Sequence, residues 1–187
     1  MTANGTLTSL YSFGAIQDTN GNALDGATPY ATLAMGSDGR LYGATFGGGT
    51  NTNGFGTIFQ MTTNGTLATL HSFGMVEDAN GYAIDGANPR GGLAQGKDGF
   101  FYGTTYNGGT NNSGMLFEIA ADGAFSTLYQ FTGAKDGANP SGSLIPGIDG
   151  SFYGTTVNGG ANGEGTVFHF SVRNTFTACF SVDYSNE

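Results

Sequence analysis

The two longest loops of the sequence carry oxygen-bearing side chains at a shared spacing. They read DTNGNALDG at Asp18–Gly26 and DANGYAIDG at Asp78–Gly86. In proteins, Ca²⁺ is held by carboxylate and amide oxygens that converge around a tight turn. The pattern Asp-x-Asn-Gly-x-x-x-Asp therefore predicts one calcium ion in each loop. The predicted ligands are Asp18, Asn20, Asp25, Asp78, Asn80 and Asp85.

The same loops have a second interpretation, in which each aspartate bonds to its own backbone. An Asp side chain commonly accepts nearby N–H groups and so stabilises a turn without any metal. The loops are shorter than an EF-hand loop and lack its terminal glutamate. The third copy of this segment keeps Asp136 but has neither the first aspartate nor the asparagine. The residues alone leave both interpretations open.

Other reactive side chains are few and do not recur. His71 and His169 occupy non-equivalent positions, and the lone Cys179 rules out a disulfide within the chain. We expect the histidines to be ordinary strand residues and Cys179 to be a small buried side chain. A glycosidase would need two carboxylates that converge from different loops. Because the copies offer only repeated turn aspartates, we predict that the protein is not an enzyme.

The chain contains three copies of one unit. The most similar segments are DGRLYGATFGGG at Asp38–Gly49, DGFFYGTTYNGG at Asp98–Gly109 and DGSFYGTTVNGG at Asp149–Gly160. Their tyrosines, Tyr42, Tyr102 and Tyr153, are 60 and then 51 residues apart. A period of this size is typical of a supersecondary unit that buries its apolar faces against its neighbours.

The composition predicts an all-β fold. The chain has 35 glycines and 13% aromatic residues, and no segment shows helical periodicity. Short apolar segments alternate with Asp-Gly, Asn-Gly and Gly-Gly turn signals. In the second copy, the four predicted strands are Gly92–Gln95, Phe100–Thr104, Met115–Ile119 and Ala124–Phe131. The predicted core phenylalanines are Phe13, Phe59, Phe73, Phe117, Phe131 and Phe168.

The fourth strand of each unit is apolar on both faces, which requires cover on both sides. Blades of a β-propeller stack face to face and provide that cover. We therefore predict a single repeat domain over residues 1–187, made of three antiparallel four-stranded units like propeller blades. The ring would be incomplete, or completed by assembly, and a β-trefoil is the alternative fold. The predicted boundaries are residues 2–14 for an extra strand and 15–73, 74–131 and 132–184 for the repeats.

A set of short motifs also resembles a known family. The motifs LxxLYSF, DGAxP, SDGxLYGTT, NGG and GTVF recur over essentially the whole chain. As a set, they resemble the GloVer, or Gloeo/Verruco, tandem repeats of bacterial surface and secreted proteins. The resemblance implies an extracellular bacterial repeat protein, and membership by itself establishes no biochemical activity.

The charge balance excludes one class of partner. The chain has 14 acidic and five basic residues, for a formal net charge of −9, and its basic residues form no cluster. Nucleic-acid binding needs a concentrated basic face. No apolar run approaches the roughly 18 residues of a membrane span. No signal-peptide pattern follows Met1, so an extracellular location requires that a leader has already been removed.

The two ends of the sequence both match the fourth strand of a unit. Asn174–Val182 would serve the third repeat, which leaves Thr6–Phe13 without a preceding repeat to join. An unpaired strand is a template for pairing with another chain. We therefore predict self-association into a homo-oligomer or filament through Leu7, Leu10, Tyr11 and Phe13. The alternative function is a carbohydrate-binding, lectin-like module or an adhesion module, in which Tyr106, Asn107 and Asn158 would hold a sugar.

Overall fold

The computed structural model describes residues 5–172, and every ladder between its strands is antiparallel. The first sheet comprises β1 (Ala34–Met35), β2 (Leu41–Thr45), β3 (Thr57–Met61) and β4 (Leu67–Ser72). The second comprises β5 (Ala94–Gln95), β6 (Phe101–Thr105), β7 (Met115–Ile119) and β8 (Phe125–Gln130). The third comprises β9 (Ala138–Pro140), β10 (Ile145–Pro146), β11 (Ser151–Asn158) and β12 (Thr166–Ser171). We call these sheets blades 1, 2 and 3.

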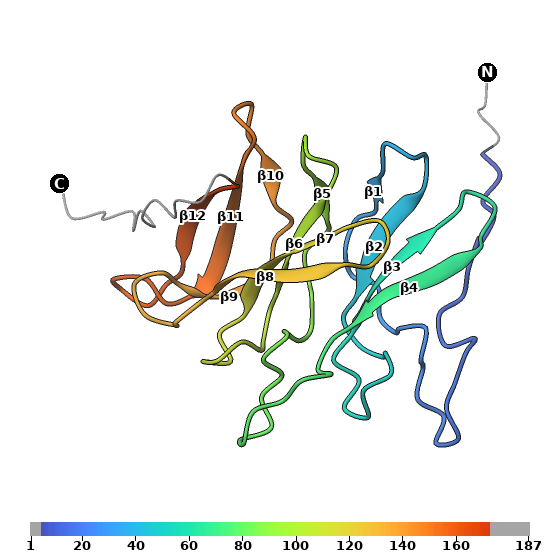
Figure 1. The fold of residues 1–187 in the computed structure, drawn as a ribbon, viewed down its shortest axis with the longest axis horizontal. Coiled ribbons are helices and arrows are strands. Elements are labelled where there is room, and N and C mark those ends of the chain that lie inside the picture. The colour runs from blue at the N-terminus through green and yellow to red at the C-terminus, as the bar shows by residue number, and fades with distance from the viewer. Residues whose placement is uncertain (1–4, 173–187) are drawn as a thin grey trace.

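The blades follow one another in chain order and stack face to face (Figure 1). We call the side of a blade that meets the next blade its front, and the opposite side its back. The first junction packs Tyr42 and Ile58 from the front of blade 1 against Phe101 and Phe117 from the back of blade 2. The second junction repeats this arrangement one blade later. The core is therefore divided between two blade junctions, which is the packing of a β-propeller and not of a β-trefoil.

The repeated Tyr-Gly-x-Thr motif lies on β2, β6 and β11, and its first two copies make these junctions. The Tyr42 ring stacks on Phe101 at 3.9 Å between centroids, and Tyr102 meets Phe152 at 4.4 Å. Residue 43 must be glycine, because a Cβ there would lie 2.6 Å from the Phe59 ring. The motif predicted from the sequence as a repeat marker is therefore the packing element of the fold.

The observed strands agree with the predicted ones within a residue or two. In the second unit the first and last strands are shorter than predicted, β6 begins and ends one residue later than predicted, and β7 has the predicted bounds. Five of the six predicted core phenylalanines are buried, and Phe13 is half-buried. The predicted fourth strand of blade 3, Asn174–Val182, and Cys179 within it lie outside the described residues. In the range 5–172, no helix is present that could cross a membrane.

Residues 5–14, which we call the N-terminal segment, pair with none of the described strands. The extra strand predicted at Thr6–Phe13 is therefore not formed among residues 5–172. The segment lies beside blade 1 (Figure 1), and the Phe13 ring meets Phe59 edge-on at 5.1 Å. The same edge-on contact joins Phe73 to Phe117 at 5.6 Å at the next junction.

A second contact of the N-terminal segment is also repeated inside the fold. At Gly65, a Cβ would lie 2.4 Å from the backbone oxygen of Leu10. At the equivalent Gly123, the nearest backbone oxygen is that of Leu70, on β4. The N-terminal segment therefore contacts blade 1 as β4 contacts blade 2. It occupies the position that the outer strand of a blade before blade 1 would occupy.

One aspartate per repeat fastens the outer strand of one unit to the loop of the next. The Asp25 carboxylate accepts the N–H groups of Gly14 and Ala15 at 3.0 and 3.1 Å. It also accepts the Tyr11 hydroxyl at 2.6 Å. Asp85 and Asp136 accept backbone N–H groups in the same way at the two blade junctions. We call these three residues the latch aspartates.

The aromatic partner of the latch differs at the first junction. Tyr129 donates its hydroxyl to Asp136 at 2.8 Å, as Tyr11 does to Asp25. The equivalent His71 places its Nε2 at 3.6 Å from the Asp85 carboxylate, too far for a hydrogen bond. This nitrogen is buried and has no hydrogen-bond partner among the described residues. The His71 ring stacks on Phe125 at 4.0 Å, so only the polar contact is missing.

We expect His71→Tyr to stabilise the protein, because the hydroxyl would restore the hydrogen bond to Asp85. The expected gain in the free energy of unfolding is about 1 kcal/mol, or about 2–4 °C in Tm for a chain of this size. Calorimetry of the wild type, His71→Tyr and the matched control His71→Phe measures it. Equal gains in the two variants would assign the effect to ring burial and contradict the latch.

Candidate functional site

A chain of asparagine side chains crosses both blade junctions. Asn88, in the link that enters blade 2, has a left-handed φ of 57°. Its N–H donates to the Phe55 carbonyl at 2.7 Å, and its Nδ2 donates to the Phe46 carbonyl at 3.0 Å. Both acceptors belong to blade 1. A single asparagine therefore ties two blades together with two hydrogen bonds, and Asn tolerates the left-handed conformation that this requires.

The next junction has the same construction. Asn139 has a φ of 58°, and its N–H and Nδ2 donate to the carbonyls of Ser113 and Tyr106 at 2.7 and 2.9 Å. Within blades 2 and 3, a second asparagine then supports the first. Asn107 Nδ2 donates to Asn88 Oδ1, and Asn158 Nδ2 donates to Asn139 Oδ1, both at 3.1 Å. We call Asn88, Asn107, Asn139 and Asn158 the asparagine ladder.

The asparagine ladder gives a structural account of two residues predicted to hold a sugar. Asn107 and Asn158 use their side-chain amides for blade contacts, and Tyr106 accepts a ladder hydrogen bond with its carbonyl. The sequence analysis did not single out the residue before the repeated proline. This residue is Asn88 in blade 2 and Asn139 in blade 3. A carbohydrate role for these residues stays a prediction.

Blade 1 departs from the ladder at both positions. Thr28 stands where the entering asparagines stand, and Gly47 stands where their supports stand. Thr28 keeps the left-handed φ of 58°. A β-branched residue is costly in this region, by about 1–2 kcal/mol. The back of blade 1 therefore keeps the backbone geometry of a junction but lacks the amide that would donate across it.

The front of blade 3 is exposed where the other two fronts are buried. Val167 is 50% exposed, whereas its equivalents Ile58 and Leu116 are at most 1% exposed. Tyr153 is 43% exposed, whereas Tyr42 and Tyr102 are fully buried. Ile145 on the same face is 67% exposed. Within residues 5–172, blade 3 thus has the apolar face that would pack on a following blade, and this face is exposed.

The back of blade 1 is uncovered in a complementary way. Leu33 is 49% exposed, whereas its equivalents Leu93 and Leu144 are below 10% exposed. The N-terminal segment covers only part of this face, through Tyr11 and Phe13. The described chain therefore presents two different open apolar faces, one at each end of the stack of blades.

The predicted calcium loops make the hydrogen bonds of self-stabilised turns. The Asp18 carboxylate accepts the N–H groups of Asn20 and Asn22, each at 2.8 Å. Asp78 accepts the equivalent N–H groups of Asn80 and Tyr82 at 2.8 and 2.9 Å. The pKa of each carboxyl lies below its usual range. The largest cause for Asp18 is the Asn22 side-chain amide, which donates to it at 2.8 Å, and the largest cause for Asp78 is the Tyr82 N–H.

The other predicted carboxylate ligands, Asp25 and Asp85, serve as latch aspartates. Asp25 is 2% exposed and already accepts three hydrogen bonds. Over the described part of the chain, no three His, Cys, Asp or Glu side chains gather as metal ligands. A calcium ion would therefore require the loops to exchange existing hydrogen bonds for metal bonds. Calcium binding stays a prediction.

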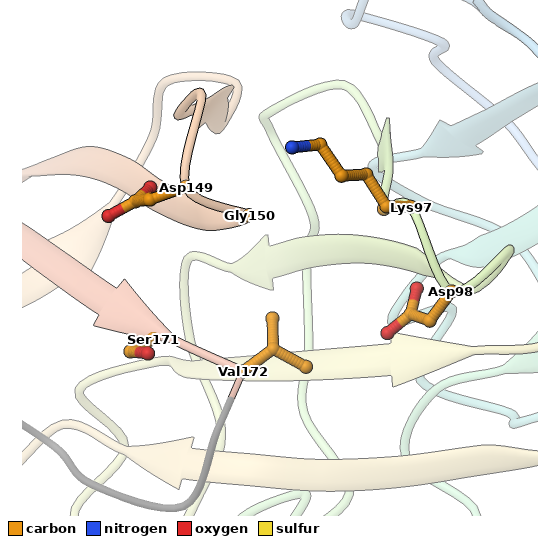
Figure 2. A pocket seen from close by; sticks show the side chains of 7 residues that line it. Lys97, Asp98, Asp149, Gly150, Ser171 and Val172 are labelled. Carbon is orange, nitrogen blue, oxygen red and sulfur yellow. The ribbon is translucent and has the colours of Figure 1, made fainter.

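A pocket of about 380 Å³ opens between the hairpin turns of blades 2 and 3 (Figure 2). Lys97 and Asp98 come from one turn, and Asp149 comes from the other. Lys97 Nζ donates to the carbonyl of Ile148 at 2.6 Å and so bridges the two turns.

Each carboxylate at this pocket accepts a hydrogen bond from its own hairpin. Asp98 accepts the Tyr102 hydroxyl at 2.6 Å, and Asp149 accepts the Ser151 N–H at 3.0 Å. The side chain and N–H of Ser151 lower the pKa of Asp149 below its usual range. A general acid needs a raised pKa near neutrality. Asp149 is therefore suited to a turn and unsuited to protonating a leaving group.

The latch predicts a pH dependence of stability at Asp25. Burial would raise the pKa of Asp25, but the Tyr11 hydroxyl and the N–H groups around Gly14 outweigh it, so the pKa lies below the usual range. A lowered folded-state pKa means that the stabilisation is complete above about pH 4, the unfolded value. It is then lost as the pH falls through the folded value.

We expect Asp25→Asn to lower the free energy of unfolding by about 2 kcal/mol at pH 7, since its hydrogen bonds are charge-assisted. The difference from the wild type should shrink as the pH falls below about 4. Urea titrations from pH 2.5 to pH 7 measure both effects. Asp122→Asn is the control, because Asp122 accepts a single turn hydrogen bond that asparagine also accepts. A difference that stays constant with pH would contradict the charged latch.

The calcium prediction is tested by chelation. If the loops bind Ca²⁺ in the folded state only, calcium should raise the unfolding midpoint of the wild type and a chelator should reverse the rise. The variant Asp18→Ala/Asp78→Ala should lose this response while keeping both latch aspartates. Calorimetry of both proteins, in about 2 mM calcium and in excess chelator, separates the two interpretations. Equal wild-type midpoints in the two buffers would contradict calcium binding by these loops.

Comparisons with known proteins bear on the family and on the fold. The sequence search against curated proteins found no match. The structure is similar to that of virginiamycin B lyase from Staphylococcus aureus, with 14% sequence identity and a TM-score of 0.48 over 78% of this chain and 39% of that one. It is also similar to a putative gluconolactonase, with 16% identity and a TM-score of 0.43 over 74% of this chain and 43% of that one.

The chain spans about two-fifths of the length of these two structures, and the likeness carries no information about activity. The sequence profile of the Gloeobacter/Verrucomicrobia repeat matches residues 75–187, more than half of the chain. This match includes the second and third copies of the Tyr-Gly-x-Thr motif, whose role at the blade junctions is described above. The chain therefore belongs to the Gloeobacter/Verrucomicrobia repeat family.

Proposed function

We propose that this protein is a non-enzymatic, extracellular bacterial repeat protein that assembles with copies of itself by exchange of a terminal strand. One observation carries the proposal. The N-terminal segment makes on blade 1 the contacts that β4 makes on blade 2, through Phe13 and Leu10. In the assembly, this segment is the outer strand of blade 3 of a neighbouring copy.

The internal junctions supply the geometry of this contact. The front of a neighbour's blade 3, with Val167 and Tyr153 exposed, packs on the back of blade 1, with Leu33 exposed. Pairs of faces that are equivalent to these two are buried against each other at both junctions within the chain. Exposed apolar faces of this kind mark interaction sites.

The register of the exchanged strand follows from the internal ladders. His71 pairs with Ile58 in blade 1, and Tyr129 pairs with Leu116 in blade 2. By equivalence, Tyr11 of one copy pairs with Val167 of the next. Among the described strands, β12 is paired on one side, by β11, and its other side is the edge that the N-terminal segment would occupy. The predicted strand Asn174–Val182 of the same copy competes for this edge.

This contact is heterologous, because it joins different surfaces of two identical chains. Repetition of such a contact closes a ring if the rotation closes, and otherwise extends a filament. The proposal that the protein is extracellular rests on the family resemblance. The proposal that it is not an enzyme is supported by the carboxylates at the pocket in Figure 2, which hydrogen bonds hold in their turns.

We expect Leu7→Glu to weaken association without changing the stability of the monomer. The Leu7 side chain is 98% exposed in the single chain, whereas its equivalent Phe125 packs into the first junction. A charge there opposes burial in the exchanged strand. Sedimentation velocity over a concentration series measures the shift towards monomer. Thr8→Glu is the matched control, since its equivalents Ala68 and Ser126 stay exposed in formed blades.

Two further variants test the opposite face and the missing amide. Val167→Glu should weaken association as Leu7→Glu does, because it charges the accepting face. Thr28→Asn should strengthen association, because it restores the amide that donates across internal junctions at Asn88 and Asn139. A wild-type chain that stays monomeric at 100 µM, a concentration of the order at which weak specific contacts form, would overturn the proposal. Association that Leu7→Glu and Thr8→Glu reduce equally would also overturn strand exchange.

A further inference from the structure

An arginine lies between two aromatic rings at the first blade junction. The guanidinium carbon of Arg90 is 3.7 Å from the centroid of the Tyr106 ring and 5.3 Å from that of Phe46. Phe46 follows β2 and Tyr106 follows β6, so the guanidinium bridges blades 1 and 2. Stacking of this kind is attractive and holds the guanidinium over the rings.

The charge of Arg90 is not neutralised within the described chain. In residues 5–172, no carboxylate lies within 4.0 Å of its nitrogens, whereas Arg40 has Asp38 and Gln60 as partners. The fixed guanidinium can donate two parallel hydrogen bonds to a carboxylate with little further loss of conformational entropy.

An exposed aromatic ring lies beside this guanidinium. Tyr30 is 66% exposed and packs edge-on against Phe46 at 5.4 Å. Tyr30 and Arg90 line a cleft of about 320 Å³, which is within the range of sites for small ligands. The cleft combines one cation, one exposed apolar ring with a hydroxyl, and access from solvent.

We infer that this cleft binds a sugar that bears a carboxylate, such as a uronic acid residue. The carboxylate accepts the paired hydrogen bonds of Arg90, and the apolar face of the sugar ring packs on Tyr30. A neutral sugar would leave the cation unpaired, and a bare anion would leave Tyr30 uncovered. Tyr30 stands at the position equivalent to Arg90, in the link that enters blade 1, so the cleft borders the face that the proposed self-assembly would cover.

The other blades show that the cleft is not required by the repeat. Tyr30, Arg90 and Ser141 occupy equivalent positions. Phe46 and Tyr106 follow β2 and β6, and the equivalent Val157 lies within β11. The second junction has Ser141 in place of the arginine, and that junction packs through its own apolar cluster. The cation is therefore an addition at one junction, made where two aromatic residues flank it.

Isothermal titration calorimetry with tri-galacturonate tests the site in the full chain at low ionic strength. We expect binding that Arg90→Gln weakens at least tenfold and that added salt weakens. Galactotriose, which lacks the carboxylates, should bind at least tenfold more weakly, and inorganic phosphate should not compete. Tyr30→Ala should weaken the sugar acid while leaving the unfolding midpoint unchanged, because its ring is largely exposed.

Three results would overturn this inference. One is that tri-galacturonate does not bind, and another is that Arg90→Gln binds it as tightly as the wild type. The third is that phosphate competes as well as the sugar acid, which would show a general anion site. Arg90→Lys separates folding from recognition, since it keeps the charge over the rings but loses the paired donors; it should retain the wild-type midpoint and bind more weakly. Arg40→Gln is the matched control for loss of a surface arginine and should bind normally.

Discussion

The fold depends on the stacking of one blade on the next, since no blade buries both of its faces alone. Tyr42 is buried because Phe101 of the next blade lies 3.9 Å from it, and Tyr153 is exposed where the described chain offers no next blade. Burial of an aromatic side chain contributes about 2–3 kcal/mol. The stability of each blade is therefore shared with its neighbours, as in other repeat proteins. The two faces that stay exposed are the outermost ones, the back of blade 1 and the front of blade 3.

Polar contacts give these apolar junctions a defined register. Apolar packing alone tolerates sliding, whereas a hydrogen bond fixes a distance and a direction. At each junction, a latch aspartate holds the outer strand and a left-handed asparagine holds the inner link, as Asp85 and Asn88 do between blades 1 and 2. The two contacts lie at different strands of the blade, so together they restrict rotation of one sheet on the other.

Much of this fold could be predicted from the sequence because its signals are local and repeated. The hairpin turns, the strands around Phe117 and the burial of the aromatic residues follow from Asp-Gly signals and from alternating apolar residues. The calcium prediction took the spacing of Asp18 and Asp25 as a ligand set. In the fold, Asp18 stabilises its own turn, whereas Asp25 bonds to Tyr11 and Gly14. Spacing along a loop did not indicate which carboxylate a distant strand would use.

The asparagine ladder and Arg90 could not be predicted for a related reason. The partners of Asn139 are carbonyls 26 and 33 residues earlier, at Ser113 and Tyr106, and no local pattern pairs them. Comparison of the copies does show which positions differ in residue type, and residues at those positions make different contacts from one copy to the next. A residue that all copies share serves the junction, as Gly43 and its equivalents do beneath the phenylalanine ring.

A residue that differs from its equivalents in the other copies either makes no contact at the junction or belongs to a junction with different contacts. Thr28 lacks the amide that its equivalents donate, at the back of the first blade. Arg90 adds a charge where the next copy has Ser141. Mutation in one copy of a repeat leaves the other junctions intact, so such a position can acquire a binding role at the cost of one local contact. In a protein built from equivalent folding units, we therefore expect binding sites at the positions where the copies differ in sequence. We also expect them at the two faces that no further blade covers.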